Sequence, residues 1–322
     1  MEFTLLTSYP EMDVLAGEWN ALLDESASHV PFLRHEYQTN WWQTRGGGEW
    51  PSAELAVVVA RENGHLVGIA PMFFDHNREG DPALLLLGSI EISDYLDVIA
   101  RPADLPGFLD GLLEFLDGLT APAWKSLDWY NLLEGSATLP ALAAAASKRG
   151  WNLRVETLQH SPYISLPGDW ESYLASIDKK QRHEVRRKIR RLEEADVPSR
   201  WYFARDPETI QADADAFIDM MAQDPEKEAF LSDAMRAHMR QTMICALEAD
   251  CLNLAFLEIE GKKAAGYLSF DYLNRVWVYN SGLDRSFMEY SPGWVLLGYL
   301  LQWANDQKRL EFDFMRGDEE YK

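Results

Sequence analysis

The feature that most constrains the fold is a β-hairpin pattern that occurs twice, about 200 residues apart. Residues 56–74 and residues 254–272 each contain a β-rich run, a short polar turn and a second β-rich run. Gly64 and Gly261 occupy the two turns, where glycine is favoured because it adopts positive φ without steric cost. The repetition predicts two domains of the same type.

The segments around the two hairpins correspond as well. Each hairpin follows a strand and two helices, and precedes a further strand, an apolar helix and a short strand with one acidic residue. In the first half we expect these elements at 1–8, 12–25, 35–45, 83–100, 105–119 and 125–132, followed by a helix at 138–150 and strands at 151–157 and 162–166. In the second half we expect them at 200–204, 208–222, 230–249, 275–284, 291–306 and 309–317. The pattern predicts an α/β (α+β) fold with mixed central sheets flanked by helices.

A chain of 322 residues has room for two cores. We place the first domain at 1–166 and the second at 196–322, the latter without the final helix and strands of the first. Residues 167–195 are expected to form a basic helical connector between them.

Within this connector, residues 179–191 carry eight lysines and arginines, although the formal net charge of the chain is −22. Val185, Ile189 and Leu192 lie on one face of the expected helix, and the charges lie on the others. The basic residues can pair with carboxylates and fix the orientation of the domains. Alternatively, an arginine on one face of this helix holds an anionic acceptor or a CoA phosphate; Arg190 lies on this face together with the two candidates, Arg182 and Arg186.

Composition excludes several classes of protein. The negative charge counts against DNA binding, which requires a broad basic surface. The N-terminus has no signal-peptide pattern, no apolar run reaches transmembrane length, and both cysteines fit buried thiols, so we expect a cytoplasmic protein. His35, His160 and His183 show no metal-ligand spacing, and we predict no metal. The oligomeric state is left open.

The order of elements resembles the GCN5-related N-acetyltransferase (GNAT) fold, and the tandem arrangement resembles the BioF2-like family, which includes CelD-like and FemABX-related acyltransferases. The resemblance covers the whole chain, and its sharpest signals lie at residues 279–284, 291–293 and 312–322. It implies an acyltransferase that uses acetyl-CoA or another acyl-CoA as co-substrate, with no permanently bound cofactor.

In this fold the pyrophosphate of CoA lies at the N-terminus of a helix, where unpaired N–H groups and the helix dipole attract anions. In the second domain this position corresponds to Ser291, Gly293 and Trp294, with Ser291 expected as the N-cap. A capped helix without a ligand is the alternative. In the first domain Asp104 stands at the equivalent turn and would repel a phosphate. We therefore expect the first domain not to bind CoA and to form a wall of the acceptor cleft.

The candidate catalytic residues lie at the end of the chain. Asp313, among apolar neighbours on a central strand, is a candidate general base, although Asp128 holds the matching place in the first domain and both could be structural hydrogen-bond acceptors. Asp318 or Glu319 could act as the base instead, and Tyr321 could protonate the leaving thiolate.

The candidate substrate-binding residues are the two arginines of the basic connector named above together with Tyr279, Asn280, Arg316 and Lys322. Arg316 could bind a carboxylate or phosphate, because ligands bind at the carboxyl edges of such sheets. Tyr279 and Asn280 would line the acyl or acceptor pocket.

The leading hypothesis is acyl transfer from acyl-CoA to an amine or hydroxyl, on a sugar or another cell-envelope precursor, as in surface-polysaccharide synthesis. A second hypothesis is a FemABX-like aminoacyl transfer from charged tRNA, against which the negative net charge counts. A third is a non-catalytic binding module of the same fold.

Overall fold

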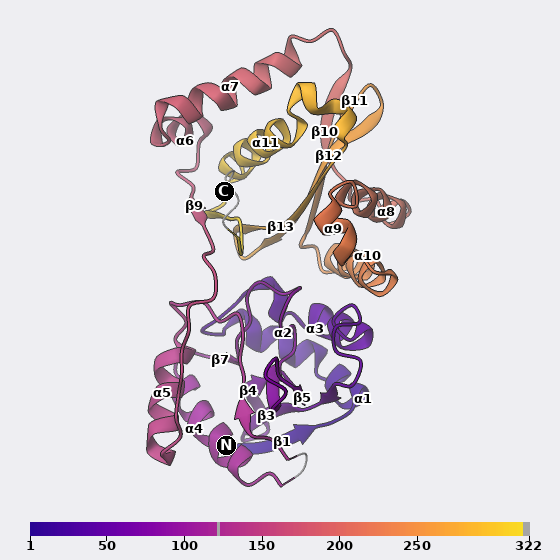
Figure 1. Cartoon of the computed structure of the whole chain (residues 1–322). Coiled ribbons are helices and arrows are strands. Elements are labelled where there is room, and N and C mark those ends of the chain that lie inside the picture. The colour runs from indigo at the N-terminus through magenta and orange to yellow at the C-terminus, as the bar shows by residue number, and fades with distance from the viewer. Residues whose placement is uncertain (121–122, 318–322) are drawn as a thin grey trace. The chain divides into compact units, whose positions relative to one another are not determined.

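The computed structural model describes residues 1–120 and 123–317 (Figure 1). The chain divides into two compact units, Met1–Leu158 and Gln159–Lys322. The division falls earlier than the domain boundary expected at residue 166, and the segment expected as a connector belongs to the second unit.

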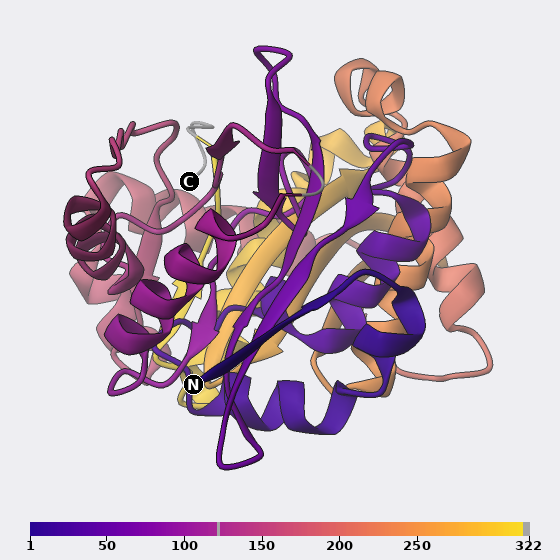
Figure 2. The same cartoon turned by 90° about the horizontal axis from the view of Figure 1, so that it is seen from below.

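The first unit contains two four-stranded sheets, with strand orders β1-β3-β4-β7 and β2-β5-β6-β8. Its strands are β1 (Glu2–Leu6), β2 (Glu54–Leu55), β3 (Val57–Glu62), β4 (His65–Ala70), β5 (Met72–His76), β6 (Pro82–Leu86), β7 (Ile99–Ala100) and β8 (Ser126–Leu127). Its helices are α1 (Tyr9–Asp13), α2 (Ala16–Asp24), the 3-10 helix η1 (Pro31–Leu33), α3 (His35–Thr44), α4 (Leu105–Asp117) and α5 (Thr138–Arg149). In Figure 2 the indigo helices of the N-terminal segment and the magenta helices α4 and α5 lie on opposite sides of these strands.

The hairpin predicted in the first half is the β3–β4 pair, in which Val59 lies opposite Ile69. Gly68 is required there by packing, because a Cβ at this position would lie 2.1 Å from Cδ2 of Phe108 in α4. The glycine thus lets the helix approach the sheet closely.

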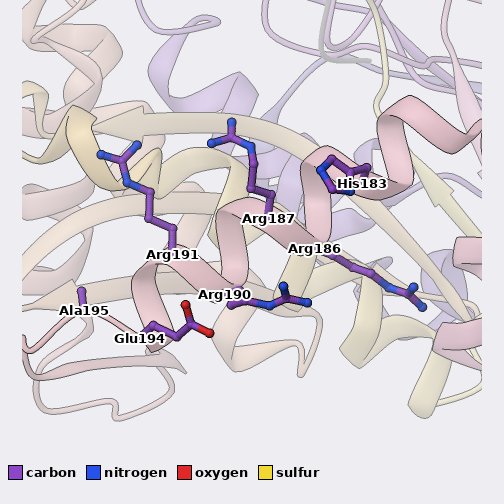
Figure 3. Close-up of a pocket in the computed structure, with 7 residues that line it drawn as sticks. All are labelled: His183, Arg186, Arg187, Arg190, Arg191, Glu194 and Ala195. Carbon is purple, nitrogen blue, oxygen red and sulfur yellow. The ribbon is translucent and has the colours of Figure 1, made fainter.

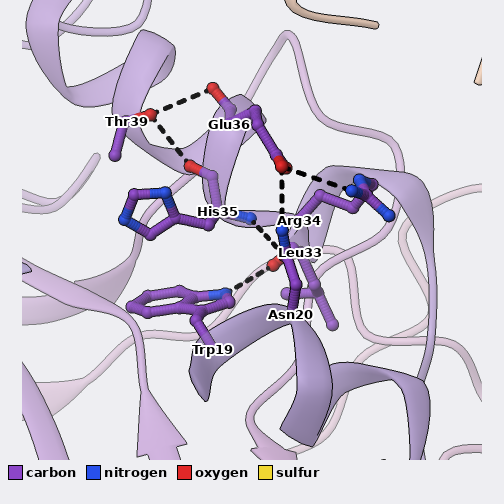
Figure 4. Close-up of polar contacts among 7 residues, drawn as sticks. All are labelled: Trp19, Asn20, Leu33, Arg34, His35, Glu36 and Thr39. Carbon is purple, nitrogen blue, oxygen red and sulfur yellow. Dashed lines mark hydrogen bonds and ion pairs between the residues drawn. The ribbon is translucent and has the colours of Figure 1, made fainter. Parts of the chain in front are cut away.

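Polar contacts fix α3 against α2 (Figure 4). The indole N–H of Trp19 donates to the carbonyl of Leu33 at 2.8 Å, and the amide of Asn20 donates to Glu36 at 2.8 Å. His35 is buried beside Trp19, where burial lowers its pKa, and it packs as a core residue.

The second unit has one six-stranded sheet in the order β10-β11-β12-β13-β14-β9. The strands are β9 (Tyr163–Ser165), β10 (Ser199–Phe203), β11 (Leu252–Ile259), β12 (Lys262–Tyr272), β13 (Arg275–Leu283) and β14 (Glu311–Asp313). The helices are α6 (Trp170–Ser176), α7 (Lys179–Glu193), α8 (Ile210–Met221), α9 (Pro225–Phe230), α10 (Asp233–Glu248), the 3-10 helix η2 (Arg285–Tyr290) and α11 (Pro292–Asp306).

The strand β9 differs in its place from the sequence prediction. The sequence prediction makes it the last strand of the first domain, but it pairs with β14 in the second sheet, with Ile164 opposite Phe312. The edge strand next to β14 in this sheet is therefore β9, which precedes the other five strands of the sheet in the sequence. The strand predicted over residues 151–157 is wrong: this segment has no strand partner among the described residues, and its side chains are mostly exposed.

Helices cover both faces of the second sheet (Figure 1). The helices α6, α7 and α11 lie on one face, and α8, α9 and α10 lie on the other. The basic helix α7 packs closely on α11, because a Cβ at Gly298 would lie 2.9 Å from Cδ1 of Ile189 and 3.7 Å from Cγ1 of Val185. Leu192 of the same stripe is 1% exposed and belongs to this core. The predicted apolar stripe of the basic stretch is thus part of the second core.

Candidate functional site

The strands β13 and β14 separate after a short parallel pairing. Only Arg275–Trp277 and Glu311–Asp313 are paired, although β13 continues to Leu283. Beyond this point the amide of Phe314 donates to the carbonyl of Pro162 at 3.0 Å, so the chain after β14 follows the β9 side. The parallel ladder therefore ends before β13 does, which leaves a gap in the ladder between these splayed strands at their carboxyl ends, the edge where ligands bind in α/β sheets.

A β-bulge lies at the start of this gap. Leu268 of β12 pairs with Asn280, whereas the next residue, Ser269, pairs with Val278, which leaves Tyr279 as the extra residue of β13. A bulge turns the strand locally and changes the direction of its side chains. The half-buried ring of Tyr279 contacts Phe270 on β12 at a centroid distance of 5.8 Å.

A lysine from α9 lies against the same part of β13. The Nζ of Lys227 donates to Oδ1 of Asn280 at 2.9 Å and to the carbonyl of Ser281 at 2.6 Å. The side chain of Asn280 thus already binds a cation, which sequence reasoning missed because Lys227 lies in a segment without a recognisable motif.

The helix α11 begins next to the carboxyl end of β13. A Cβ at Gly293 would lie only 2.8 Å from the side chain of Leu283, the last residue of that strand. Packing against Leu283 is therefore one reason for glycine at position 293.

The expectation that Ser291 caps α11 through its side chain is wrong. Ser291 has φ 52° and ψ 51°, and its side chain makes no capping hydrogen bond. A capping serine normally has an extended backbone, from which its hydroxyl reaches the first amides. Among the described residues no side chain caps the first turn of α11, so the amides of Gly293 and Trp294 are open there, at the positive end of the helix dipole.

A cation from α7 lies beside this turn. The Nζ of Lys188 lies 4.1 Å from the centroid of the Trp294 ring, and Trp294 is 41% exposed. Partial burial lowers the pKa of Lys188. The N-terminus of α11 thus combines open amides with a positive side chain, which is an arrangement suited to a phosphate.

Asp313 is buried at the end of β14, and its Oδ1 accepts a hydrogen bond of 2.6 Å from the amide of Met315. Met315 has φ 56°, so this contact stabilises a left-handed turn that ends the strand. The half-buried Arg316 follows directly. The remaining predicted residues, Asp318, Glu319, Tyr321 and Lys322, lie outside the described residues.

The arginines of α7 fall into two groups. Three have partners within the unit: Arg182 donates to the carbonyl of Leu174 at 3.0 Å, Arg186 pairs with Glu171 at 2.5 Å, and Arg187 pairs with Glu184 at 2.8 Å. Arg190 and Arg191 make no ion pair or side-chain hydrogen bond with any residue that the structure describes.

The outward side chains of α7 line a surface hollow of about 550 Å³. Figure 3 shows the guanidinium groups of Arg187 and Arg191 on one side of the helix and those of Arg186 and Arg190 on the other. The helix thus presents a dense positive surface in a chain of strongly negative net charge.

The first unit has a counterpart of the splayed strands. The strands β6 and β8 pair in parallel only at Ala83 with Ser126 and Leu84 with Leu127. The equivalent helix α4 begins after Asp104, whose carboxylate lies 3.4 Å from the guanidinium of Arg101. The N-terminus of α4 therefore carries an ion pair, and an added anion would compete with the carboxylate of Asp104 for the same charge.

Two acidic groups near β8 and β6 have raised pKa values. Burial raises the pKa of Asp128, which accepts a hydrogen bond of 3.1 Å from the hydroxyl of Tyr130. Burial also raises the pKa of Glu49 to about 7, and the negative charge of Glu91 adds to this effect. Glu49 was not singled out from the sequence, because its environment is built by residues distant in the chain.

In the described part of the chain, no group of three or more His, Cys, Asp or Glu side chains is arranged to hold a metal ion. No helix among these residues is both long and apolar enough to cross a membrane.

The comparisons with known proteins agree with this geometry. Residues 179–322 match the family described as Acetyltransferase (GNAT) domain. The crystal structure of FemX superposes with a TM-score of 0.66 at 11% identity, covering 99% of this chain and 90% of that one. A conserved protein of unknown function from Bacteroides thetaiotaomicron gives 0.56 at 14% identity, covering 99% and 92%. L-PGS from Bacillus licheniformis gives 0.54 at 11%, covering 95% and 78%. No curated protein sequence matches the chain.

The short parallel pairing of two strands and the helix between them are the arrangement of the GNAT fold. The chain has a tandem GNAT-like fold that is also found in FemX, and residues 179–322 match the GNAT acetyltransferase domain family. The fold class and the family resemblance predicted from the sequence are confirmed.

Proposed function

We propose that the chain transfers an acyl group from acyl-CoA to an amine or hydroxyl acceptor at the splayed strands of the second unit. The observation that carries this proposal is the short pairing of β13 with β14, with the open N-terminus of α11 beside the end of β13. A gap between parallel strands accommodates an extended pantetheine chain, and the helix N-terminus accommodates the pyrophosphate.

The pyrophosphate would accept hydrogen bonds from the amides of Gly293 and Trp294, and Ser291 would border it. Lys188 supplies a positive charge at the same turn. This assignment gives the basic helix a direct role, because α7 places Lys188 there by packing on α11. No permanently bound cofactor is required, since CoA enters and leaves with each turnover.

The reaction is a nucleophilic substitution at the thioester. The acceptor nitrogen or oxygen forms a bond to the carbonyl carbon, the carbon–sulfur bond breaks, and the thiolate leaves. We assign removal of the acceptor proton to Asp318 or Glu319, and protonation of the thiolate to Tyr321. For Asp313 we favour a positioning role over the role of base, because its carboxylate holds the turn at Met315.

The acceptor would be bound near the bulge of β13 by Tyr279 and Asn280, and by Arg316 and Lys322 beyond β14. Sugars and other cell-envelope precursors offer the amines and hydroxyls that such a site acylates, and a cytoplasmic location gives access to acyl-CoA. Arg182 and Arg186 would contribute through α7. Both have partners within the unit, so a ligand must compete with the Leu174 carbonyl and the Glu171 carboxylate.

The first unit is assigned no CoA site. The carboxylate of Asp104 at the N-terminus of α4 opposes a second pyrophosphate there, and its neighbour Arg101 also pairs with Glu25.

The test is binding of acetyl-CoA, and of longer acyl-CoA esters, to the full chain by thermal shift and calorimetry. A ligand that binds only the native state raises the unfolding midpoint. Lys188→Gln should weaken binding about fivefold to tenfold, because it removes one charge-assisted phosphate contact. Lys180→Gln makes the same charge change on the same helix away from the α11 N-terminus and should leave the affinity unchanged. If no CoA ester binds, the proposal is wrong.

Arg190 and Arg191, which have no side-chain partner in the described part of the chain, favour a second candidate, the aminoacyl transfer from charged tRNA. Exposed arginines on one helix can contact a phosphate backbone, even where the net charge of the protein is negative. Fluorescence anisotropy with a charged tRNA at increasing salt would test it. This candidate predicts salt-sensitive binding that the double variant Arg190→Gln/Arg191→Gln abolishes, and acyl-CoA binding would then be absent.

A further inference from the structure

A second hollow lies in the Gln159–Lys322 unit at the end of the sheet opposite to the splayed strands. It has a volume of about 570 Å³. Its walls come from the start of β11, the turn between β12 and β13, and the last turn of α11. The parallel pair β13 and β14 begins at this end, so the hollow is separate from the proposed acyl-transfer site.

The floor of this hollow contains a buried amide with an unused donor. Asn253 is 1% exposed, and its Oδ1 accepts a hydrogen bond of 3.1 Å from Arg205. Its Nδ2 has no hydrogen-bond partner among the residues that the structure describes. Ser269, directly opposite on β12, is 2% exposed, and its hydroxyl has no partner in this part of the chain either. Ser269 does not line the hollow, whereas Asn253 does. Buried polar groups are rarely left unpaired, so the unused donor of Asn253 indicates a missing polar partner.

The charged side chains around the hollow are not all neutralised. Arg309 and Asp271 form a bidentate pair, with both distances 2.7 Å, which leaves neither charge available. Arg205 bonds only the neutral Asn253 and stacks over Phe203, and Asp250 has no ion pair with any described residue. One positive and one negative group therefore remain for a ligand.

The wall beside Arg205 is aromatic. The rings of Phe203 and Trp303 meet edge to face with centroids 4.9 Å apart, and both line the hollow. Such a wall binds an apolar group while the polar floor fixes its orientation.

We propose that this hollow binds a free α-amino acid with an apolar side chain. The ligand carboxylate accepts hydrogen bonds from Arg205 and from Nδ2 of Asn253, and its ammonium group pairs with Asp250. Its side chain packs against Phe203 and Trp303. A simple anion fits less well, because it would leave the charge of Asp250 unpaired, whereas a zwitterion matches both unneutralised charges. The hollow lies apart from the proposed acyl-transfer site, and the inference does not rest on the acyl-transfer proposal.

The experiment is calorimetry of the full chain with three probes of the same carbon skeleton. L-Leucine carries both charged groups, 4-methylpentanoate lacks the ammonium group, and 3-methylbutylamine lacks the carboxylate. We expect L-leucine or another apolar L-amino acid to bind at millimolar concentration or below, and its two partial analogues to bind at least about tenfold more weakly. If no apolar L-amino acid binds at about 10 mM, or if either analogue binds equally well, the inference is overturned.

Two pairs of variants locate the binding. Arg205→Gln and Asp250→Asn should each weaken the affinity about tenfold or more. Arg200→Gln on the exposed strand β10 is the control for Arg205→Gln, because it removes the same charge. Glu260→Gln is the control for Asp250→Asn, because Glu260 is also an acidic residue with a left-handed backbone. Both control variants should bind the amino acid with normal affinity. Amino-acid binding that survives Arg205→Gln would place the ligand elsewhere and refute the site. Acetyl-CoA binding should be unchanged in all four variants, so failure here is distinguishable from failure of the acyl-transfer proposal.

Discussion

The attachment of the basic helix α7 to the second core can be tested through Leu192. This side chain is 1% exposed and packs in the same hydrophobic cluster as α11. Truncating a buried leucine to alanine costs about 2–5 kcal/mol, which combines the lost transfer free energy with the cavity left behind. Since α7 is an outer helix that can partly relax, we expect Leu192→Ala to cost about 3 kcal/mol.

The assay is urea unfolding of the full chain, followed by hydrogen exchange in peptides from α11, which report on the second unit alone. With a slope of about 2 kcal/mol per molar urea, the midpoint should fall by roughly 1.5 M. Arg191→Ala, the neighbouring exposed position without an ion pair among the described residues, should change the free energy of unfolding by no more than about 0.5 kcal/mol. Equal effects of the two variants would show that α7 is a loosely attached connector and refute the packing argument.

Three other predictions concern single residues. Because burial raises the pKa of Glu49 to about 7, its contribution to stability is complete below the unfolded pKa near 4.5 and is lost as the pH rises through 7. Between pH 5 and pH 8 the free energy of unfolding should therefore fall by about 1–2 kcal/mol more in the wild type than in Glu49→Gln, after allowance for the partial exposure of Glu49. Asp313→Asn keeps an acceptor for the Met315 amide and should retain the pH–rate profile of acyl transfer. In contrast, Asp318→Asn or Glu319→Gln should alter this profile. An altered profile in Asp313→Asn would identify Asp313 as the base. Gly68→Ala should destabilise the first unit by about 1–3 kcal/mol through a clash with Phe108, whereas Gly17→Ala, with open space around it in α2, should stabilise it by about 0.5–1 kcal/mol in thermal unfolding.

The local elements of the fold were predictable, because hydrophobic periodicity and turn chemistry are written in neighbouring residues. Both hairpins appear where the glycine turns predicted them, and α11 spans Pro292–Asp306, close to the expected 291–306. The stripe of Val185, Ile189 and Leu192 correctly predicted a buried face on the basic helix.

The partner of a short strand was not predictable. The strand β9 (Tyr163–Ser165) forms three residue pairs with β14. Nothing in these three residues distinguishes pairing with the first sheet from pairing with β14. Strand pairing between distant segments depends on the geometry of the whole sheet, which a local pattern does not contain.

The candidate site was predictable only in part. The motif around Ser291 correctly located the helix start, but not the left-handed backbone that removes its capping role. Lys188 and Lys227 were missed because each acts through an element far away in sequence, the first through α11 and the second through β13. A lysine in a basic run or a surface segment gives no sign of such a contact.

The most direct test of the central claim is hydrogen exchange of the full chain with and without saturating acetyl-CoA. The account predicts added protection in residues 278–283 of β13 and in the first turn of α11 at residues 292–296, with no change at the start of α4 near residue 104. Protection confined to the first unit, or none in either unit, would contradict a CoA site at the splayed strands of the second.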